Sequence, residues 1–237
     1  MLVCTLSCSQ SKKSEVEALL VSGVVSACFQ PSEVDVSLYV SKRDGIDCLR
    51  EVSVENLVIA TNGGIFDGNH HPLGLCYDGE LVTPLNLDEG EGNFYLKPNG
   101  VFYLEGGNAF IVESSQFTRD LASLNLAIQS GPLLLDRGQI HPSFRVSSKN
   151  AFTRNAIGVK SNGAVCVAYF SEPLNLYRTA MYMRDTLGCE SALYLDGAIS
   201  GVLTPVAGDR LDQSFASILV VRDFGEKGEA KARSESP

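Results

Sequence analysis

Polar side chains follow apolar, strand-like runs at several separate points of this chain. The run at residues 57–60 breaks into an Asn-Gly-Gly turn at 62–64, and a carboxylate, Asp67, follows shortly after. The run at 192–195 ends in a similar way at Asp196. Glycine allows such sharp turns because it has no Cβ. Rigid strand ends hold polar side chains in place, so we expect several of these residues to share one site.

The residue types at these positions are those that bind sugars and phosphates. A guanidinium binds phosphate oxygens as a fork, and carboxylates stabilise an oxocarbenium ion or attack an anomeric carbon. Backbone N–H groups in a glycine turn can form an anion nest. Two simpler interpretations stay open: Arg154 can be a solvated charge at a strand end, and Asp196 with Gly197 can be an ordinary turn. The set comprises Asn62, Asp67, Asn93, Lys97, Gln129, Ser130, Arg154, Asn155, Asp196 and Ser200.

The histidines do not indicate a metal site. His70 and His71 are adjacent, so on a strand they would face opposite ways, and their spacing from Asp67 matches no common ligand set. His141 follows a glycine turn and has either a site role or a structural one. No serine lies in a Gly-x-Ser-x-Gly nucleophile elbow. We therefore expect neither a metal nor a cofactor.

The apolar pattern predicts a β-rich chain. Residues 34–40 alternate between apolar and polar, as in a half-buried strand. Turn residues at 78–79, 98–100 and 161–163 predict three hairpins. A long helix is expected at 174–187, because apolar residues recur there with helical spacing and a glycine follows.

Ser14 and Glu17 fit a capping box, which predicts a short helix ending near Gly23. The second hairpin would pair residues 94–97 with 101–104. The expected fold class is α+β: a β-rich single domain with a mixed or antiparallel sheet built from hairpins and two or three packed helices. We expect three segments: an N-terminal segment with a short helix (1–33), the folded domain (34–223) and a disordered tail (224–237).

Charge and cysteine content limit the function classes. The chain has 237 residues and a net charge of −9, which argues against general nucleic-acid binding. The chain has seven cysteines, an odd number, and no C-x-x-C pair, so reduced thiols are favoured over a structural disulfide. No signal peptide or membrane span is visible in the sequence. We expect a cytoplasmic protein, or a periplasmic or secreted one if the sequence is trimmed; the oligomeric state is left open.

Several of these motifs, taken in order along the chain, resemble the phosphodiester glycosidase family. The similarity runs from about residue 34 to residue 221 and is greatest to the short bacterial members. Two positions depart from the family pattern: Ile65 replaces an aromatic residue, and Ala198 replaces a glycine. The motifs are 61–66, 72–74, 92–100, 129–133, 154–158 and 194–197.

The resemblance implies a hydrolase that cleaves the bond between a sugar's anomeric carbon and a phosphodiester oxygen, with a glycosyl phosphodiester, such as one of N-acetylglucosamine, as its small-molecule partner. It implies catalytic roles for Asp196, Arg154 and Asp67, with Arg154 and Lys97 as candidates to hold the leaving phosphate. The implied substrate-binding residues are Asn62, Gly63, Gly64, Lys97, Gln129, Ser130, Asn155, Ser200 and His141. The altered turn at Ala198 leaves an alternative open: a non-catalytic protein that binds a phosphorylated sugar or nucleotide.

Overall fold

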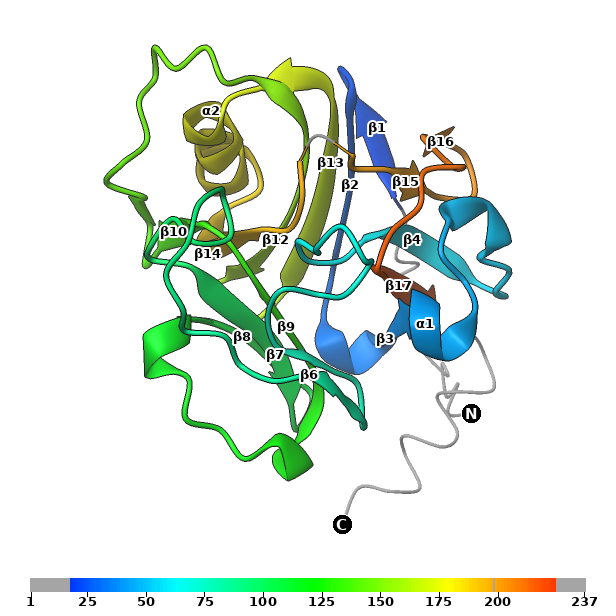
Figure 1. Cartoon of the computed structure of the whole chain (residues 1–237). Coiled ribbons are helices and arrows are strands. Elements are labelled where there is room, and N and C mark those ends of the chain that lie inside the picture. The colour runs from blue at the N-terminus through cyan, green and yellow to red at the C-terminus, as the bar shows by residue number, and fades with distance from the viewer. Residues whose placement is uncertain (1–17, 198, 225–237) are drawn as a thin grey trace, which may run out of the picture.

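The strands of the computed structural model form three antiparallel sheets in the residues that it describes, 18–197 and 199–224 (Figure 1). The largest sheet has seven strands in the order β1 (Leu19–Val21), β2 (Val24–Phe29), β13 (Val165–Leu174), β12 (Phe152–Lys160), β14 (Cys189–Tyr194), β10 (Leu133–Asp136) and β11 (Gln139–Ile140). The second has β16 (Gly208–Asp209), β15 (Val202–Leu203), β4 (Leu57–Asn62), β17 (Ser217–Asp223) and β3 (Val34–Val40). The third has β6 (Leu81–Thr83), β5 (Cys76–Tyr77), β9 (Leu124–Ser130), β7 (Gly100–Glu105) and β8 (Asn108–Glu113).

Alternation along the central strands divides the core into layers. On β12, Ile157 packs into the core shared by all three sheets, whereas Ala156 faces the opposite way. That second face is covered by helix α2 (Leu176–Met181) and the π-helical turn that continues it, Tyr182–Thr186 (Figure 1). Because successive strand residues point to opposite faces, a single strand supplies both layers.

The helices are shorter than the sequence pattern predicts. The expected helix at 174–187 is present as α2 and its π turn, capped by Asn175, whose Oδ1 accepts from the Arg178 N–H at 2.9 Å. Apart from it, the described residues contain α1 (Ser41–Asp44) and short 3-10 turns at Pro31–Glu33, Leu49–Glu51, Ser114–Gln116 and Leu121–Ser123. The fold is therefore more purely β than expected. None of the helices in the described ranges is long and apolar enough to cross a membrane.

Two local expectations were wrong. The helix expected to end near Gly23 is replaced at Leu19–Val21 by β1, which forms a hairpin with β2; Ser14 and Glu17 lie outside the described residues. Residues 94–97 form turns rather than a strand, and β7 pairs instead with β8 and β9. The hairpins at 78–79 and 161–163 and the strand at 34–40 are confirmed. The expected tail falls almost entirely outside the described residues.

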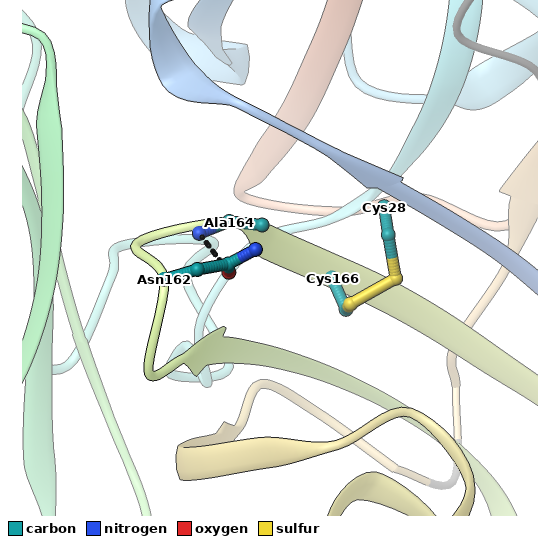
Figure 2. Close-up of a disulfide and its surroundings, with 4 residues drawn as sticks. All are labelled: Cys28, Asn162, Ala164 and Cys166. Carbon is teal, nitrogen blue, oxygen red and sulfur yellow. Dashed lines mark hydrogen bonds between the residues drawn. A yellow bond between two sulfur atoms is a disulfide. The ribbon is translucent and has the colours of Figure 1, made fainter.

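Cys28 and Cys166 form a disulfide between neighbouring strands (Figure 2). The two residues lie directly opposite each other on β2 and β13, with their Cα atoms 4.1 Å apart. The expectation of reduced thiols was therefore wrong for this pair, because the β2–β13 register brings together two cysteines that are 138 residues apart in sequence. Figure 2 also shows the nearby β12–β13 turn, where Asn162 Oδ1 accepts from the Ala164 N–H at 3.1 Å.

Breaking this disulfide is expected to lower stability. A cross-link that closes so long a loop typically contributes about 2–5 kcal/mol, much of it by restricting the unfolded chain. We expect Cys166→Ala to lower the melting temperature of oxidised protein, and dithiothreitol to have no further effect on the variant. Cys48→Ala, which removes a free thiol, is the matched control. Equal melting temperatures for wild type and Cys166→Ala would contradict a stabilising disulfide.

Candidate functional site

Arg154 is a buried cation near the end of the β12–β14 pair. Arg154 is 1% exposed, so its interpretation as a solvated charge at a strand end is wrong. The guanidinium donates from Nε to the Leu174 carbonyl at 3.0 Å and from Nη1 to the Tyr194 hydroxyl at 2.8 Å. Nη2 donates to the Asn150 carbonyl at 3.2 Å. Among the described residues, its hydrogen-bond acceptors are neutral, which is an uncommon environment for a buried charge.

The strand end at Tyr194 places a carboxylate close to this charge. Gly197 packs directly against the guanidinium: a Cβ on it would lie 2.6 Å from Arg154 Nη1. Only glycine fits there, which explains the Asp-Gly sequence better than turn propensity alone. Asp196 precedes this glycine, and its Oδ1 accepts from the Gly197 N–H at 2.6 Å. Asp196 and Arg154, separated in sequence, are thus brought together.

Burial sets the electrostatics of this pair. Desolvation raises the pKa of Asp196 to about 6, although the Gly197 N–H and the charge of Arg154 both act to lower it. Desolvation likewise raises the pKa of Tyr194 to about 12, so this hydroxyl stays protonated. A carboxyl that titrates near neutral pH beside a fixed cation is an arrangement found at catalytic sites.

Asn155 connects the two strand ends that the sequence motifs mark. Its Nδ2 donates to Asn62 Oδ1 at 3.0 Å and to Thr61 Oγ1 at 3.0 Å, while its Oδ1 accepts from the Asp196 N–H at 2.9 Å and the Ser200 hydroxyl at 3.1 Å. Four of these five residues are buried, and Asp196 is half-buried. This geometry favours a scaffold role for Asn62, Asn155 and Ser200: they hold the Asp196 backbone in place.

The glycine turn after β4 serves close packing. The Gly63 N–H donates to the Ser217 carbonyl at 2.8 Å, and a Cβ on Gly63 would collide with the Ser217 side chain. A Cβ on Gly64 would lie 2.8 Å from the Gln129 carbonyl oxygen. Neither glycine has a positive φ, so the structure favours tight strand contacts here rather than an anion nest.

Gln129 and Ser130, at the end of β9, are buried and hydrogen-bonded within the protein. The Gln129 amide bonds the backbone of Leu75 and Asn86 as well as the Ser114 hydroxyl. Ser130 Oγ donates to the Leu195 carbonyl at 2.6 Å. These contacts favour a structural role for both residues, since their polar groups are already paired.

Asp67, Lys97 and His141 lie outside the Arg154–Asp196 hydrogen-bond network. Asp67 is half-buried; its Oδ1 accepts from the N–H groups of Asn69 at 2.8 Å and His71 at 2.9 Å, and the His71 bond is the main cause of its lowered pKa. Lys97 is exposed. His141 is buried, its Nδ1 accepts from the Ser143 N–H at 3.2 Å, and burial lowers its pKa.

A cleft of about 190 Å³ adjoins the Arg154 site. Two residues connect them: Asn150 accepts from the guanidinium, and Asn93 faces the Tyr194 hydroxyl. The cleft is lined by Asn93, Leu96, Ser143, Phe144, Arg145, Ser148, Asn150, Leu176 and Tyr177. Sequence reasoning missed Tyr194, Arg145, Asn150 and Tyr177. The first stands inside a marked motif, but the others come from a loop and a helix that carry no motif.

One group of described residues has the geometry to hold a cation. The ligand atoms of Asp47, Cys48 and Glu51 lie within 4.8 Å of one another. Asp47 and Glu51 are exposed, and each carboxylate already accepts a hydrogen bond, from Ser214 and from the Asp47 N–H respectively. Exposed acidic groups of this kind are common, and none of the Arg154–Asp196 cluster belongs to it.

Comparisons with known proteins agree with the resemblance seen in the motifs. The chain is 38% identical over 143 residues to the uncharacterized protein YigE of Escherichia coli K12, an alignment covering 60% of this chain and 56% of YigE. The chain thus matches little more than half the length of that relative.

The fold is similar to the zebrafish N-acetylglucosamine-1-phosphodiester α-N-acetylglucosaminidase catalytic domain, auto-inhibited by its pro-peptide. The TM-score is 0.63 at 15% identity, over 88% of this chain and 81% of that one. A hypothetical protein from Synechocystis matches with a TM-score of 0.53 at 13% identity, over 88% and 61% of the two chains. At these identities the likeness concerns the fold alone. The model of the phosphodiester glycosidase family matches residues 55–221, and this chain therefore belongs to that family.

Proposed function

We propose that this protein hydrolyses the bond between a sugar's anomeric carbon and the oxygen of a phosphodiester. The observation that carries the proposal is the Asp196 carboxyl, whose pKa of about 6 leaves it ionised at neutral pH beside the buried Arg154–Tyr194 pair. Family membership supports the hydrolase class.

The chemistry needs little help from a general acid. Water adds its oxygen to the anomeric carbon while the bond to the phosphate oxygen breaks, giving a free sugar and a phosphate monoester that leaves as an anion. The Asp196 carboxylate stabilises the positive charge that develops at the anomeric carbon, as nucleophile, base or counter-charge. The Gly197 N–H and the Arg154 charge both favour the ionised carboxylate, and the Tyr194 hydroxyl orients the guanidinium.

The adjoining cleft is the proposed sugar site. Its volume is below the roughly 300–1,000 Å³ typical of sites for larger ligands, so it suits a single sugar ring. Asn93, Asn150 and Ser148 offer hydrogen bonds to hydroxyls, and Tyr177 offers a ring face. Arg145, whose Nη1 donates to the Pro142 carbonyl at 2.6 Å, lines the same cleft and is exposed. We assign the phosphate contact to Arg145 rather than to the buried Arg154.

The test is an assay with a panel of sugar 1-phosphodiesters, including N-acetylglucosamine 1-(methyl phosphate), followed by mass spectrometry. We expect release of the free sugar and the alkyl phosphate in equal amounts. Arg145→Ala is expected to raise KM about 10- to 100-fold with a small effect on kcat, because a charged hydrogen bond to phosphate contributes about 1.5–3 kcal/mol.

Arg137→Ala removes an exposed arginine that does not line the cleft and is the matched control. A ligand that binds but is recovered intact after long incubation would instead support the non-catalytic alternative. No binding and no turnover across the panel would refute both.

The disulfide bears on the cell compartment. Stable disulfides occur mainly in oxidising compartments, so Cys28–Cys166 supports a periplasmic or secreted location over the cytoplasm.

A further inference from the structure

An apolar groove shares the 142–150 loop with the sugar cleft. It has a volume of about 440 Å³ and is lined by Val146, Leu174, Arg178, Met181, Tyr182, Asp185 and Thr186. Val146 is 58% exposed and Met181 is 37% exposed, so the groove presents apolar side chains to solvent without a cover from the described part of the chain. Such an apolar concavity is unusual on a protein surface unless something binds there.

The groove is built onto the same elements as the sugar cleft. The 142–150 loop supplies Arg145 and Ser148 to the cleft and Val146 to the groove, and α2 likewise lines both. Asn175 anchors the loop between them: its Nδ2 donates to the carbonyls of Val146 at 3.1 Å and Ser148 at 2.9 Å. The loop is therefore anchored where it contributes to both cavities, to the cleft through Arg145 and Ser148 and to the apolar groove through Val146.

Arg154 connects the groove to the proposed reaction centre. Its Nε donates to the carbonyl of Leu174, a groove residue, at 3.0 Å. Its guanidinium also lies 5.3 Å from the ring centre of Phe152, which is 46% exposed and pairs with Leu174 across β12 and β13. The guanidinium thus contacts the groove through the Leu174 backbone, with the Phe152 ring beside it. Each cavity also has an exposed arginine in its lining, Arg145 in the cleft and Arg178 in the groove.

We propose that this groove binds the alcohol portion of the substrate, and that this portion is apolar. The preferred substrate class is then a sugar joined through a phosphodiester to an alkyl or aryl alcohol, with the sugar in the cleft, the phosphate between the two arginines and the apolar group in the groove. The proposal rests on the proposed function for the identity of the sugar and phosphate, but the apolar preference is measurable without turnover.

The experiment measures binding of N-acetylglucosamine 1-phosphodiesters to the Asp196→Asn protein by calorimetry, so that no ligand is consumed. The methyl, hexyl and 2-phenylethyl esters are compared at concentrations below micelle formation. We expect the hexyl ester to bind at least about tenfold more tightly than the methyl ester, since burying even two methylene groups gives a change of this size. The 2-phenylethyl ester shows whether the groove prefers a chain or a ring.

A double variant, Val146→Ser with Met181→Ser, is expected to lose most of the hexyl preference while binding the methyl ester as before. The matched control is Val206→Ser with Leu81→Ser, which removes two exposed apolar side chains that line neither site. Melting curves check that both variants fold. Equal affinity for the methyl and hexyl esters, no binding of the hexyl ester, or a preference that persists in the groove variant would each overturn the proposal.

Turnover by the wild-type protein separates this inference from the proposed function. Hydrolysis of methyl and hexyl esters with equal kcat/KM would overturn the groove assignment and leave the hydrolase intact. A groove-dependent hexyl preference without hydrolysis of any ester would support the groove and refute the hydrolase.

Discussion

Asp196→Asn is expected to reduce hydrolysis of a glycosyl phosphodiester by about 10³-fold, because asparagine cannot carry the charge that a nucleophile, base or counter-charge needs at the anomeric carbon. The fold should survive, since the asparagine Oδ1 can still accept from the Gly197 N–H. The measurement is kcat/KM by product release at pH 7.5, with Asp136→Asn, an exposed carboxylate paired with Arg137, as the control.

The same variant should be more stable than the wild type at neutral pH. The folded-state pKa of Asp196 is about 6, above the ordinary value of 3.8, so the folded protein binds this proton more tightly than the unfolded chain does. Wild-type stability therefore falls as pH rises from about 4 to 6, and the cost persists above pH 6. Asp196→Asn removes this cost, so the variant should have a free energy of unfolding about 1–3 kcal/mol higher than the wild type at pH 7, but not at pH 4.

Denaturant titrations at pH 4 and pH 7 measure this difference. The activity of the wild type should rise through about pH 6 and then level off, because the ionised form is the active one. Activity that instead declines above pH 6 would show Asp196 acting as an acid. If Asp196→Asn keeps full activity, Asp196 has no part in the mechanism.

Arg154 is the second position where a large effect is expected. Arg154→Gln removes the charge that lowers the Asp196 pKa, so the midpoint of the pH–activity profile should move above 6. Arg154→Lys keeps the charge and should keep the midpoint. Both variants lose hydrogen bonds to the buried Leu174 carbonyl and Tyr194 hydroxyl, and we expect each to be less stable by about 2–4 kcal/mol.

The two substitutions together separate the electrostatic role from the packing role. Stability is measured by denaturant unfolding and the midpoint by initial rates between pH 4.5 and 8.5. If Arg154→Gln and Arg154→Lys give the same pH midpoint, the charge does not act on Asp196. If neither loses stability, the buried hydrogen bonds contribute nothing measurable.

The sequence correctly predicted those strands and hairpins that depend only on neighbouring residues. The alternation at 34–40 and the Asp-Gly and Asn-Gly turns identified strands and hairpins, because period and turn chemistry act between near neighbours. The same reasoning failed at 94–97, where an apolar stretch before Pro-Asn-Gly forms turns. There β7 pairs with β8 and β9 rather than with the residues that precede it.

The sequence identified the motif residues as candidates. Which of them hold the protein scaffold together depends on the tertiary structure. Asn62, Gln129 and Asn155 have side chains that could bind a sugar, yet each is buried with its polar groups paired to distant residues. Side-chain type alone cannot tell a ligand-binding amide from one that joins two strand ends.

The sequence by itself determined the family and the β-rich class, and it marked Arg154 and Asp196 as separate candidate site residues, because ordered motifs and local periodicity are properties of the chain. Only the tertiary structure decided that Arg154 is buried, that Cys28 meets Cys166, and that a loop and α2 form a cleft and an apolar groove beside the site. These features arise from contacts between residues far apart in sequence. Burial and register, which set charge, cross-links and cavities, are therefore fixed only when the sheets assemble.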